Sequence, residues 1–376
     1  MDDFLLEPGV TFLNHGSFGA LPASVYAEQD RWRRAVEAQP VRFLVRDLPG
    51  LIDAARDAAA DFLGAPSEGL VFVSNATAAA TAVMGSADLR PGDEILTTNH
   101  RYNAVYQAMR RAAQERGVRL VEAHVPFPLR SPEQITEAVV SAIGPRTRLL
   151  VLDQITSPTA LIFPVAEIIA QARGVPVFVD GAHVPGQIPV DLGSLGATWW
   201  TGNLHKWAFA PRGTAAFYVA PEVRERTHAA VVSHGYGLGL RAEFDWPGTF
   251  DPSPWLCVPA ALAAHARLGG ARLMADNHAR TREARRILAD ALGVALPCPD
   301  DLGLYAAMAT LPLPLRDDRG ELDRATALQL ALWDQHRIEV PILPWDGRTW
   351  VRISMQAYNT VDQVARLGEA LAALLR

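Results

Sequence analysis

Lysine is almost absent from this chain of 376 residues. Lysine and arginine together number 35, yet Lys206 is the only lysine. Arginine therefore stands wherever a positive charge alone is required. An amine can lose its proton and attack a carbonyl group, whereas a guanidinium remains protonated. A single lysine among apolar and aromatic neighbours therefore indicates Schiff-base chemistry at Lys206, and the alternative is an interfacial lysine retained by chance.

Cysteine and long apolar runs are also scarce. Cys257 and Cys298 are the only cysteines, too few for a disulfide framework or a zinc cluster, and they favour a reducing compartment. No uncharged apolar run reaches about 18 residues, and the opening MDDFLLEPG lacks the pattern of a secretion signal. A formal charge of −6 argues against a general nucleic-acid binder. We therefore expect a soluble, cytoplasmic protein that binds a small molecule rather than nucleic acid or a membrane.

Short apolar runs alternate with helical patterns over the first two thirds of the chain. The length suits two domains, or a large domain with a smaller one beside it, and the alternation predicts a parallel sheet covered by helices. After residue 259 the pattern changes to long helices with few strands, which predicts the smaller domain. Strands are expected at 70–73, 94–98, 148–152, 175–179, 197–201 and 215–219, and helices at 24–39, 48–63, 76–84 and 165–173.

A carboxylate and the single lysine follow two of these expected strands. Asp180 ends the run from 175 to 179, and Lys206 follows the run from 197 to 201. Open α/β sheets bind ligands at the carboxyl ends of their strands. Pyridoxal phosphate requires such a pair, because the acid keeps the pyridine nitrogen protonated and the amine carries the aldehyde.

Several motifs then give the chain a family resemblance. It resembles the class V aminotransferase family of fold-type I pyridoxal-phosphate enzymes, and in particular its isopenicillin N epimerase-like members. The motifs are FLNHGSFGALP at 12–22, NAT at 75–77, SPTALIFPV at 157–165, VDGAH at 179–183, NLHKW at 203–207 and WPGTFDPSPWLCVPAAL at 246–262.

The resemblance implies a fold and an assembly. It implies an α/β fold of the fold-type I transferase kind, with a mainly parallel seven-stranded sheet covered by helices and a smaller α+β C-terminal domain. The large cofactor-binding domain is expected at 20–255, and the small domain at 1–19 and 256–376. A homodimer is implied, in which Thr249 reaches the cofactor phosphate of the neighbouring subunit.

The residues expected to bind the cofactor surround Asp180 and Lys206. The small polar residues at 75–77 open a helix whose free N–H groups suit a phosphate. The resemblance places Tyr102, or His100 as the alternative, on the face of the pyridine ring, and Ser157 or Gln154 at its phenolic oxygen. The full expected set is Asn75, Ala76, Thr77, Tyr102, His100, Ser157, Asp180, His183, Asn203, His205, Lys206 and Thr249.

The residues expected to meet the substrate come from both ends of the chain. Arg352 lies on an apolar strand, and a buried arginine requires an anion. The resemblance assigns it to the α-carboxylate of the substrate, and a structural Arg–Asp pair is the alternative. The resemblance also brings Asn14, His15 and Gly16 to the mouth of the site. Arg46 could meet an anionic substrate or be solvated or ion-paired.

Two positions depart from the pattern of the relatives. Phe250 follows Thr249, whereas relatives usually have arginine at that position. The loss of this cation is expected to change which substrate charge the site prefers. Gln154 stands where relatives often have histidine, so its role is open.

The expected reaction takes place at the α-carbon of an amino acid or related amine, with Lys206 as general acid and base and Asp180 at the ring nitrogen. Racemisation or epimerisation, transamination, C–S cleavage and desulfuration all use these residues.

A cysteine desulfurase needs a thiol on a mobile loop beside the substrate, and the cysteine-loop motif of such enzymes is absent from this sequence. A non-catalytic protein that only binds the cofactor would have less reason to keep Lys206, Tyr102 and Arg352. A metal hydrolase using Asp180, His183 and His205 lacks the short ligand spacing, so no metal is expected.

Overall fold

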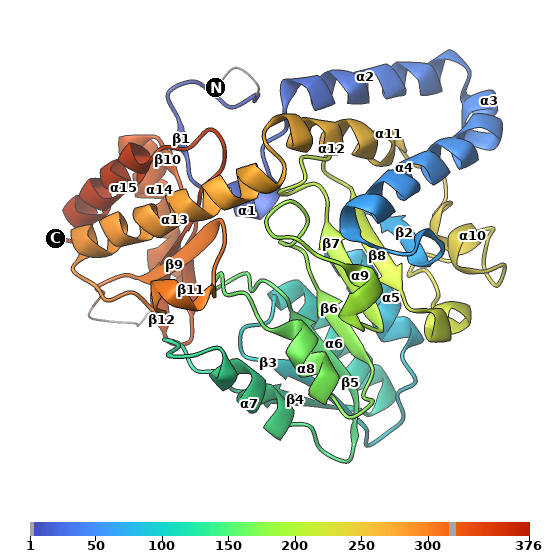
Figure 1. Cartoon of the computed structure of the whole chain (residues 1–376), viewed down its shortest axis with the longest axis horizontal. Coiled ribbons are helices and arrows are strands. Elements are labelled where there is room, and N and C mark those ends of the chain that lie inside the picture. The colour runs from blue at the N-terminus through green and yellow to red at the C-terminus, as the bar shows by residue number, and fades with distance from the viewer. Residues whose placement is uncertain (1–3, 316–320) are drawn as a thin grey trace.

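The computed structural model describes residues 4–315 and 321–376, and its centre is a seven-stranded sheet (Figure 1). The strands are β2 (Leu70–Val73), β3 (Glu94–Thr98), β4 (Arg119–Ala123), β5 (Thr147–Asp153), β6 (Val177–Asp180), β7 (Trp199–Asn203) and β8 (Ala215–Val219). Their order is β2-β8-β7-β6-β5-β3-β4. Strand β8 is antiparallel to both neighbours, and the other ladders are parallel.

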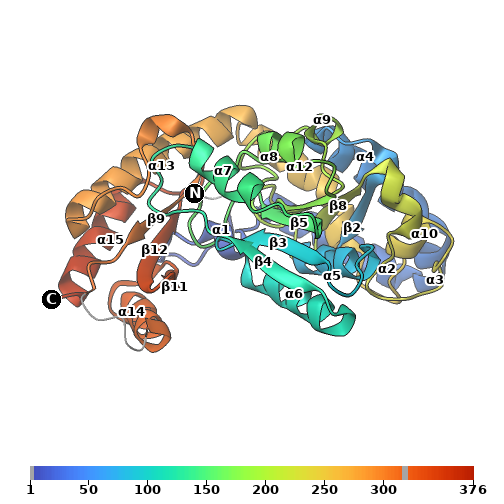
Figure 2. The same cartoon turned by 90° about the horizontal axis from the view of Figure 1, so that it is seen from below.

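Helices cover both faces of this sheet. Figure 2 shows α7 (Glu133–Ser141) and α8 (Val165–Gln171) on one side and α6 (Asn103–Arg116) on the other. The residues of β2, β3, β6, β7 and β8 are all buried, and strands covered on both faces are continuously apolar rather than alternating. The remaining helices of this part are α2 (Ala23–Ala38), α3 (Pro40–Arg42), α4 (Leu48–Leu63), α5 (Ala76–Ser86), α9 (Leu192–Leu195), α10 (Leu240–Phe244), α11 (Ser253–Leu256) and α12 (Val258–Arg267).

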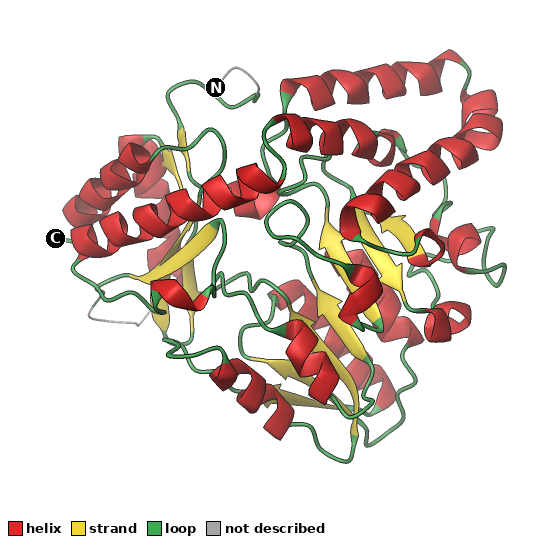
Figure 3. Cartoon of the chain, viewed as in Figure 1, coloured by secondary structure: helices red, strands yellow, loops and turns green. Residues whose placement is uncertain are grey.

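A second hydrophobic core forms near the C-terminus. Figure 3 shows the strands gathered in two separate groups, one in each core. The smaller group has the antiparallel order β11-β12-β9, and β1 pairs with β10 beside it, so the N-terminal segment joins this core. The elements are β1 (Thr11–Phe12), α13 (Ala271–Leu292), β9 (Met308–Pro312), α14 (Glu321–His336), β10 (Ile338–Glu339), β11 (Ile342–Trp345), β12 (Arg348–Ser354) and α15 (Val361–Leu374).

The expected α/β architecture is confirmed, and the differences are local. The segment at 11–19, for which no strand or helix was expected, contains β1 and the single-turn helix α1 (His15–Phe18). Strand β4 was not expected, because its edge position leaves exposed and partly buried residues in place of a continuous apolar run. The division at 20–255 remains a proposal, and residues 1–3 and 316–320 of the expected small domain lie outside the described residues. Among the helices of the described residues, none is long and apolar enough to cross a membrane.

Candidate active site

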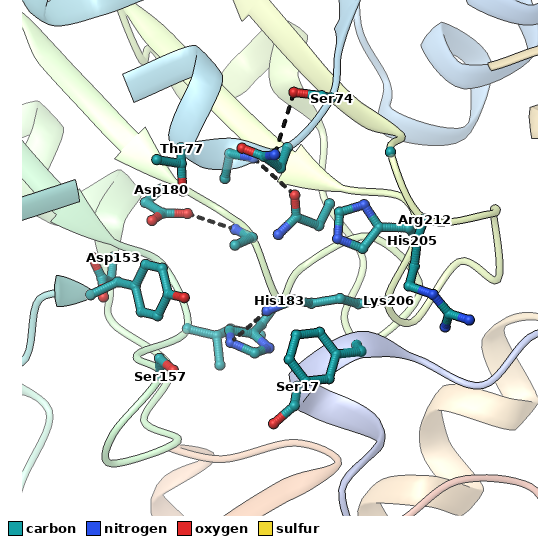
Figure 4. A pocket seen from close by; sticks show the side chains of 18 residues that line it. Ser17, Ser74, Thr77, Asp153, Ser157, Asp180, His183, His205, Lys206 and Arg212 are labelled. Carbon is teal, nitrogen blue, oxygen red and sulfur yellow. Dashed lines mark hydrogen bonds between the residues drawn. The ribbon is translucent and has the colours of Figure 1, made fainter. Parts of the chain in front are cut away.

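A cavity of about 490 Å³ opens at the carboxyl ends of the parallel strands. Its volume lies within the range of small-molecule sites. Most of the residues expected at the cofactor line it, and Figure 4 shows several of them converging on Lys206. Those lining residues are Asn75, Ala76, Thr77, Tyr102, Ser157, Asp180, His183, Asn203, His205 and Lys206.

Lys206 lies in the turn after β7 and points into the cavity. Its Nζ atom is 3.3 Å from Nε2 of His183 (Figure 4). Burial and then the positive charge of Arg352 lower the pKa of Lys206 to about 7, while Asp180 opposes the shift. The amine can therefore exist without its proton near neutral pH, as a nucleophile or general base must.

Asp180 ends β6 and is 3% exposed. One carboxylate oxygen accepts the backbone N–H of Ala182 at 2.9 Å. Burial raises the pKa of Asp180, while that hydrogen bond and the charge of Lys206 oppose the shift. No cation of the described residues lies within ion-pair distance of this carboxyl, so a protonated ring nitrogen would supply a counter-charge that the described chain lacks.

His183 follows Asp180 and lies beside Lys206. Burial and then the charges of Lys206 and Arg352 hold its pKa well below the ordinary value. It is therefore neutral, and its buried Nδ1 has no hydrogen-bond partner among the described residues. A buried ring nitrogen without a partner calls for a hydrogen bond that the described residues do not supply.

The N-terminus of α5 forms one wall of the cavity. Asn75 is the N-cap and accepts the N–H of Ala78, while Oδ1 of Asn203 accepts the N–H of Ala76 at 3.0 Å. The helix dipole favours an anion at this end. His205 is neutral because burial lowers its pKa to about 4, and its Nδ1–H donates to the carbonyl of Thr214 at 2.8 Å.

Tyr102 and His100 were both expected as the ring-stacking residue, and the structure separates them. Tyr102 lines the cavity and is 45% exposed. His100 is fully buried away from the cavity lining. Its ring nitrogens bond Oγ1 of Thr159 and the carbonyl of Val125, and its ring packs on Trp345. Tyr102 is therefore the residue whose position suits stacking.

Arg352 comes from β12 and is 4% exposed. Its Nη1 donates to the carbonyl and to Oγ of Ser157 at 2.7 and 3.0 Å, and its Nη2 donates to Oγ of Ser17 at 3.1 Å. Its Nε has no partner, and no carboxylate of the described residues lies within ion-pair distance. Burial lowers the pKa of Arg352 to about 10, so it keeps its charge at neutral pH. The alternative of a structural Arg–Asp pair therefore finds no support among the described residues.

The N-terminal residues expected at the mouth of the site lie just behind it. His15 is fully buried, and its Nε2 lies 3.1 Å from the carbonyl oxygen of Lys206. Asn14 accepts the hydroxyl of Ser17, and Gly16 packs so closely on Met308 that a Cβ would lie 2.5 Å from its sulfur. The cavity itself is lined by the next two residues, Ser17 and Phe18.

Four other expected or open positions lie outside the cavity lining. One is Arg352, although its partners Ser17 and Ser157 line the cavity. Arg46 is exposed on the turn of π-helix at Phe43–Asp47, and Thr249 is exposed on a bend. Gln154 lies behind the cavity lining, where its side-chain oxygen accepts the indole N–H of Trp200 at 2.8 Å. Among the two candidates for the phenolic oxygen, Ser157 is thus the one that lines the cavity.

Sequence reasoning missed Asp153, Ser17, Phe18 and Arg212, all of which line the cavity. Asp153 carried a usable signal, because it ends a strand as Asp180 does. Ser17, Phe18 and Arg212 carried none beyond their proximity to recognised motifs. Cys257 and Cys298 are buried outside the cavity lining, and the described residues contain no group of three or more His, Cys, Asp or Glu side chains that could hold a metal ion.

A family model and individual relatives both match most of this chain. Residues 35–301 match the family model described as aminotransferase class-V. The isopenicillin N epimerase of Streptomyces clavuligerus is 35% identical, over 98% of this chain and 96% of that protein. A putative L-cysteine desulfhydrase of Oryza sativa subsp. japonica is 33% identical, over 98% of this chain and 84% of that protein.

Solved structures with low sequence identity share the fold. The cystine C-S lyase C-DES in complex with cysteine persulfide superposes with a TM-score of 0.79 at 21% identity, covering 97% of this chain and 98% of that one. The cysteine desulfurase CsdA from Escherichia coli superposes with a TM-score of 0.78 at 20% identity, covering 100% of this chain and 98% of that one.

Proposed function

This chain belongs to the aminotransferase class-V family, and on that premise we propose that it is an epimerase-like enzyme acting at the α-carbon of an amino acid. Its cofactor is pyridoxal 5'-phosphate. The observation that carries the proposal is Arg352, a buried guanidinium without a carboxylate partner among the described residues, whose charge acts on Lys206. An amino acid offers a carboxylate to the first residue and an α-proton to the second.

The residues of the cavity fit the cofactor. The N-terminus of α5, with Asn75 to Thr77, suits the phosphate, and Asp180 suits the ring nitrogen. Lys206 is the amine for the aldehyde, and Tyr102 offers an aromatic face. The unpaired Nδ1 of His183 adds a buried polar atom that a ligand could satisfy. When bound, the cofactor supplies a ring that withdraws electrons from the carbon next to the substrate amine.

The protein residues then divide the work at the α-carbon. Arg352 binds the carboxylate through charge-assisted hydrogen bonds and fixes which substituents face Lys206. Lys206, with its pKa near 7, takes the α-proton, and epimerisation then requires a proton to be added to the opposite face of the α-carbon. His183 stays neutral beside the amine, so it adds no further charge that would depress the basicity of Lys206.

A second candidate is C–S bond cleavage, because relatives named L-cysteine desulfhydrase are 31–33% identical. That reaction also begins with removal of the α-proton by a lysine. A desulfurase that carries sulfur on a protein thiol is disfavoured, because neither Cys257 nor Cys298 lines the cavity and burial raises the pKa of Cys257 to about 12.

The test is incubation of the holoenzyme with single L- and D-amino acids in deuterated water. An epimerase yields the other stereoisomer with deuterium at the α-carbon and without any 2-oxo acid. Transamination would instead consume a 2-oxo acid acceptor, and a C–S lyase would release sulfide from cysteine. Sulfide release without stereoisomer formation from any amino acid in the panel would overturn the epimerase proposal. Lys206→Ala serves as the matched inactive control.

We also propose that the active enzyme is a homodimer with shared sites. In one chain Thr249 is exposed and does not line the cavity, so its proposed role at the phosphate requires a second copy. Mixing Lys206→Ala chains with Thr249→Ala chains would give heterodimers with one doubly damaged site and one intact site. Activity should rise above that of either homodimer, and a fully active monomer by light scattering would contradict the proposal.

A further inference from the structure

A second carboxyl group lies beside Asp180 and has no role in the chemistry above. Asp153 ends β5 as Asp180 ends β6, and the two residues are register partners in parallel strands. Neighbouring strands lie about 4.8 Å apart, and register partners project toward the same face. Both side chains are 3% exposed and both line the cavity. The floor of the site therefore contains two adjacent carboxyl groups.

The surroundings of the pair cannot neutralise two negative charges. The loop after β3 contributes Arg101, which is already ion-paired with Glu122, and the backbone N–H of Tyr102. Lys206, beyond β7, acts on Asp180 rather than on Asp153, and His183 is neutral. Arg352 holds the two serine side chains of the carboxylate site. Figure 4 shows Arg212 on the far side of the cavity from Asp153.

Two like charges at this separation strongly oppose ionisation of both groups. Burial and then the charge of Asp180 raise the pKa of Asp153 well above its ordinary value, with smaller opposition from Tyr102 and Arg101. The pKa of Asp180 is raised less strongly, since Ala182 and Lys206 favour its charged form. The two carboxyls are thus inequivalent, and Asp153 is the one that keeps the proton.

We propose that Asp153 is a positioning residue that remains a neutral carboxylic acid and limits the floor of the cofactor site to one negative charge, on Asp180. This inference rests on the proposed role of Asp180 at the ring nitrogen. A second carboxylate would compete with Asp180 for the single positive charge of the ring. With Asp153 neutral, Asp180 is the only anion that orients the ring. The side chain of Asp153 then fills space beside Asp180 without adding a charge.

The first test compares Asp153→Asn with Asp180→Asn by titrating the full-length apoprotein with pyridoxal 5'-phosphate. Asparagine preserves the shape and a hydrogen-bond donor, so Asp153→Asn should keep the dissociation constant within about threefold of wild type. Asp180→Asn should weaken binding by at least about tenfold. Equal losses in the two variants would show that Asp153 binds as an anion and would overturn the inference.

The second test reads the pair without cofactor or turnover, from the apoprotein Tm as a function of pH. A carboxyl whose folded pKa is raised binds more protons in the folded state, so stability falls as pH rises from about 4, its unfolded pKa, through the folded value. Asp153→Asn should therefore raise the Tm relative to wild type, by a margin that grows with pH. In the Asp180→Asn background this gain should shrink in part, because the like charge is gone while the burial of Asp153 remains.

If the asparagine variant does not fold, wild-type apoprotein still decides the question. Its infrared spectrum at neutral pH should contain the band of a buried protonated carboxyl group, and absence of that band would overturn the inference. If the inference fails but Asp180→Asn still loses cofactor affinity, the proposed role of Asp180 stands. Failure of the proposed role of Asp180 appears separately, as unchanged cofactor affinity in Asp180→Asn.

Discussion

Two buried arginines in this protein have opposite surroundings. Arg56, on α4, is fully buried, and its guanidinium bonds Asp53 and both carboxylate oxygens of Asp245, the latter at 2.6 Å. Arg352 is almost as deeply buried, yet it bonds only two serine hydroxyls and a carbonyl. The first cation carries its counter-charge within the described fold, and the second leaves a place for one. A buried cation of the second kind indicates a ligand site, and one of the first kind indicates structure.

The largest effect on turnover is expected at Lys206, the amine on which the charge of Arg352 acts. Lys206→Ala should lower turnover by about 10⁴-fold or more, the upper end of what a positioned acid or base contributes, without lowering the Tm. Reduction of the holoenzyme with borohydride should attach the cofactor to Lys206. Because the chain has one lysine, a lysine-specific protease should cut the untreated protein once and fail to cut the reduced protein. Continued cleavage after reduction would contradict the assignment.

The next effect tests Arg56, the arginine whose carboxylate partners lie within the described fold. Arg56→Leu would leave the partly buried Asp245 without this cation, while the exposed Asp53 keeps only its longer contact with Arg241. Breaking a buried ion pair costs about 3–5 kcal/mol. We expect the free energy of unfolding, measured with urea, to fall by about this amount, while KM of the folded fraction stays unchanged. Arg56→Lys is the matched control, and it should recover part of the loss. A stable Arg56→Leu protein would remove the contrast with Arg352.

The counterpart is Arg352→Leu, which should leave stability nearly unchanged or improve it. Loss of the substrate carboxylate contact should cost about 2–4 kcal/mol, a roughly 30- to 1,000-fold fall in kcat/KM for amino acids. The cofactor spectrum should be unaffected. At a pH well above 7, where Lys206 is neutral in both proteins, an amine substrate that lacks the carboxylate should react equally well with the variant and the wild type. An equal fall with that amine would assign Arg352 to the structure instead.

The sequence predicted the parts of this protein whose signal is local. Strands such as Leu70–Val73 and Ala215–Val219 were confirmed at their expected bounds because their apolar runs are bounded by turn residues. Asp180 and Lys206 were found because each ends or follows such a run. The sequence could not decide between Tyr102 and His100, because both lie in one loop. Only the folded loop determines which of the two side chains lines the cavity.

What the sequence could not supply was tertiary pairing. Arg56 and Arg352 both occur among apolar residues, and their difference depends on partners 189 and 195 positions away, Asp245 and Ser157. Asp153 escaped notice because its importance comes from register with Asp180 on the next strand. His15 was expected near substrate, whereas its ring contacts the backbone of Lys206 from behind. These relations appear only when separate segments are brought together.

The smallest expected effect is that of the Arg352 charge on the pKa of Lys206. Burial and the charge of Arg352 lower the pKa of Lys206 to about 7. Because only the neutral amine is nucleophilic, the rate at which apoprotein captures pyridoxal 5'-phosphate should rise with pH through about 7 and level off above it. Arg352→Gln removes a positive charge that favours the neutral amine, so the midpoint should move to higher pH. The matched control is Arg212→Gln, since Arg212 lines the cavity together with Lys206 but acts electrostatically on His205, and its midpoint should not move. Stopped-flow absorbance across the pH range measures both, and an equal shift in the two variants would show that general loss of positive charge, rather than Arg352 itself, sets the basicity of the lysine.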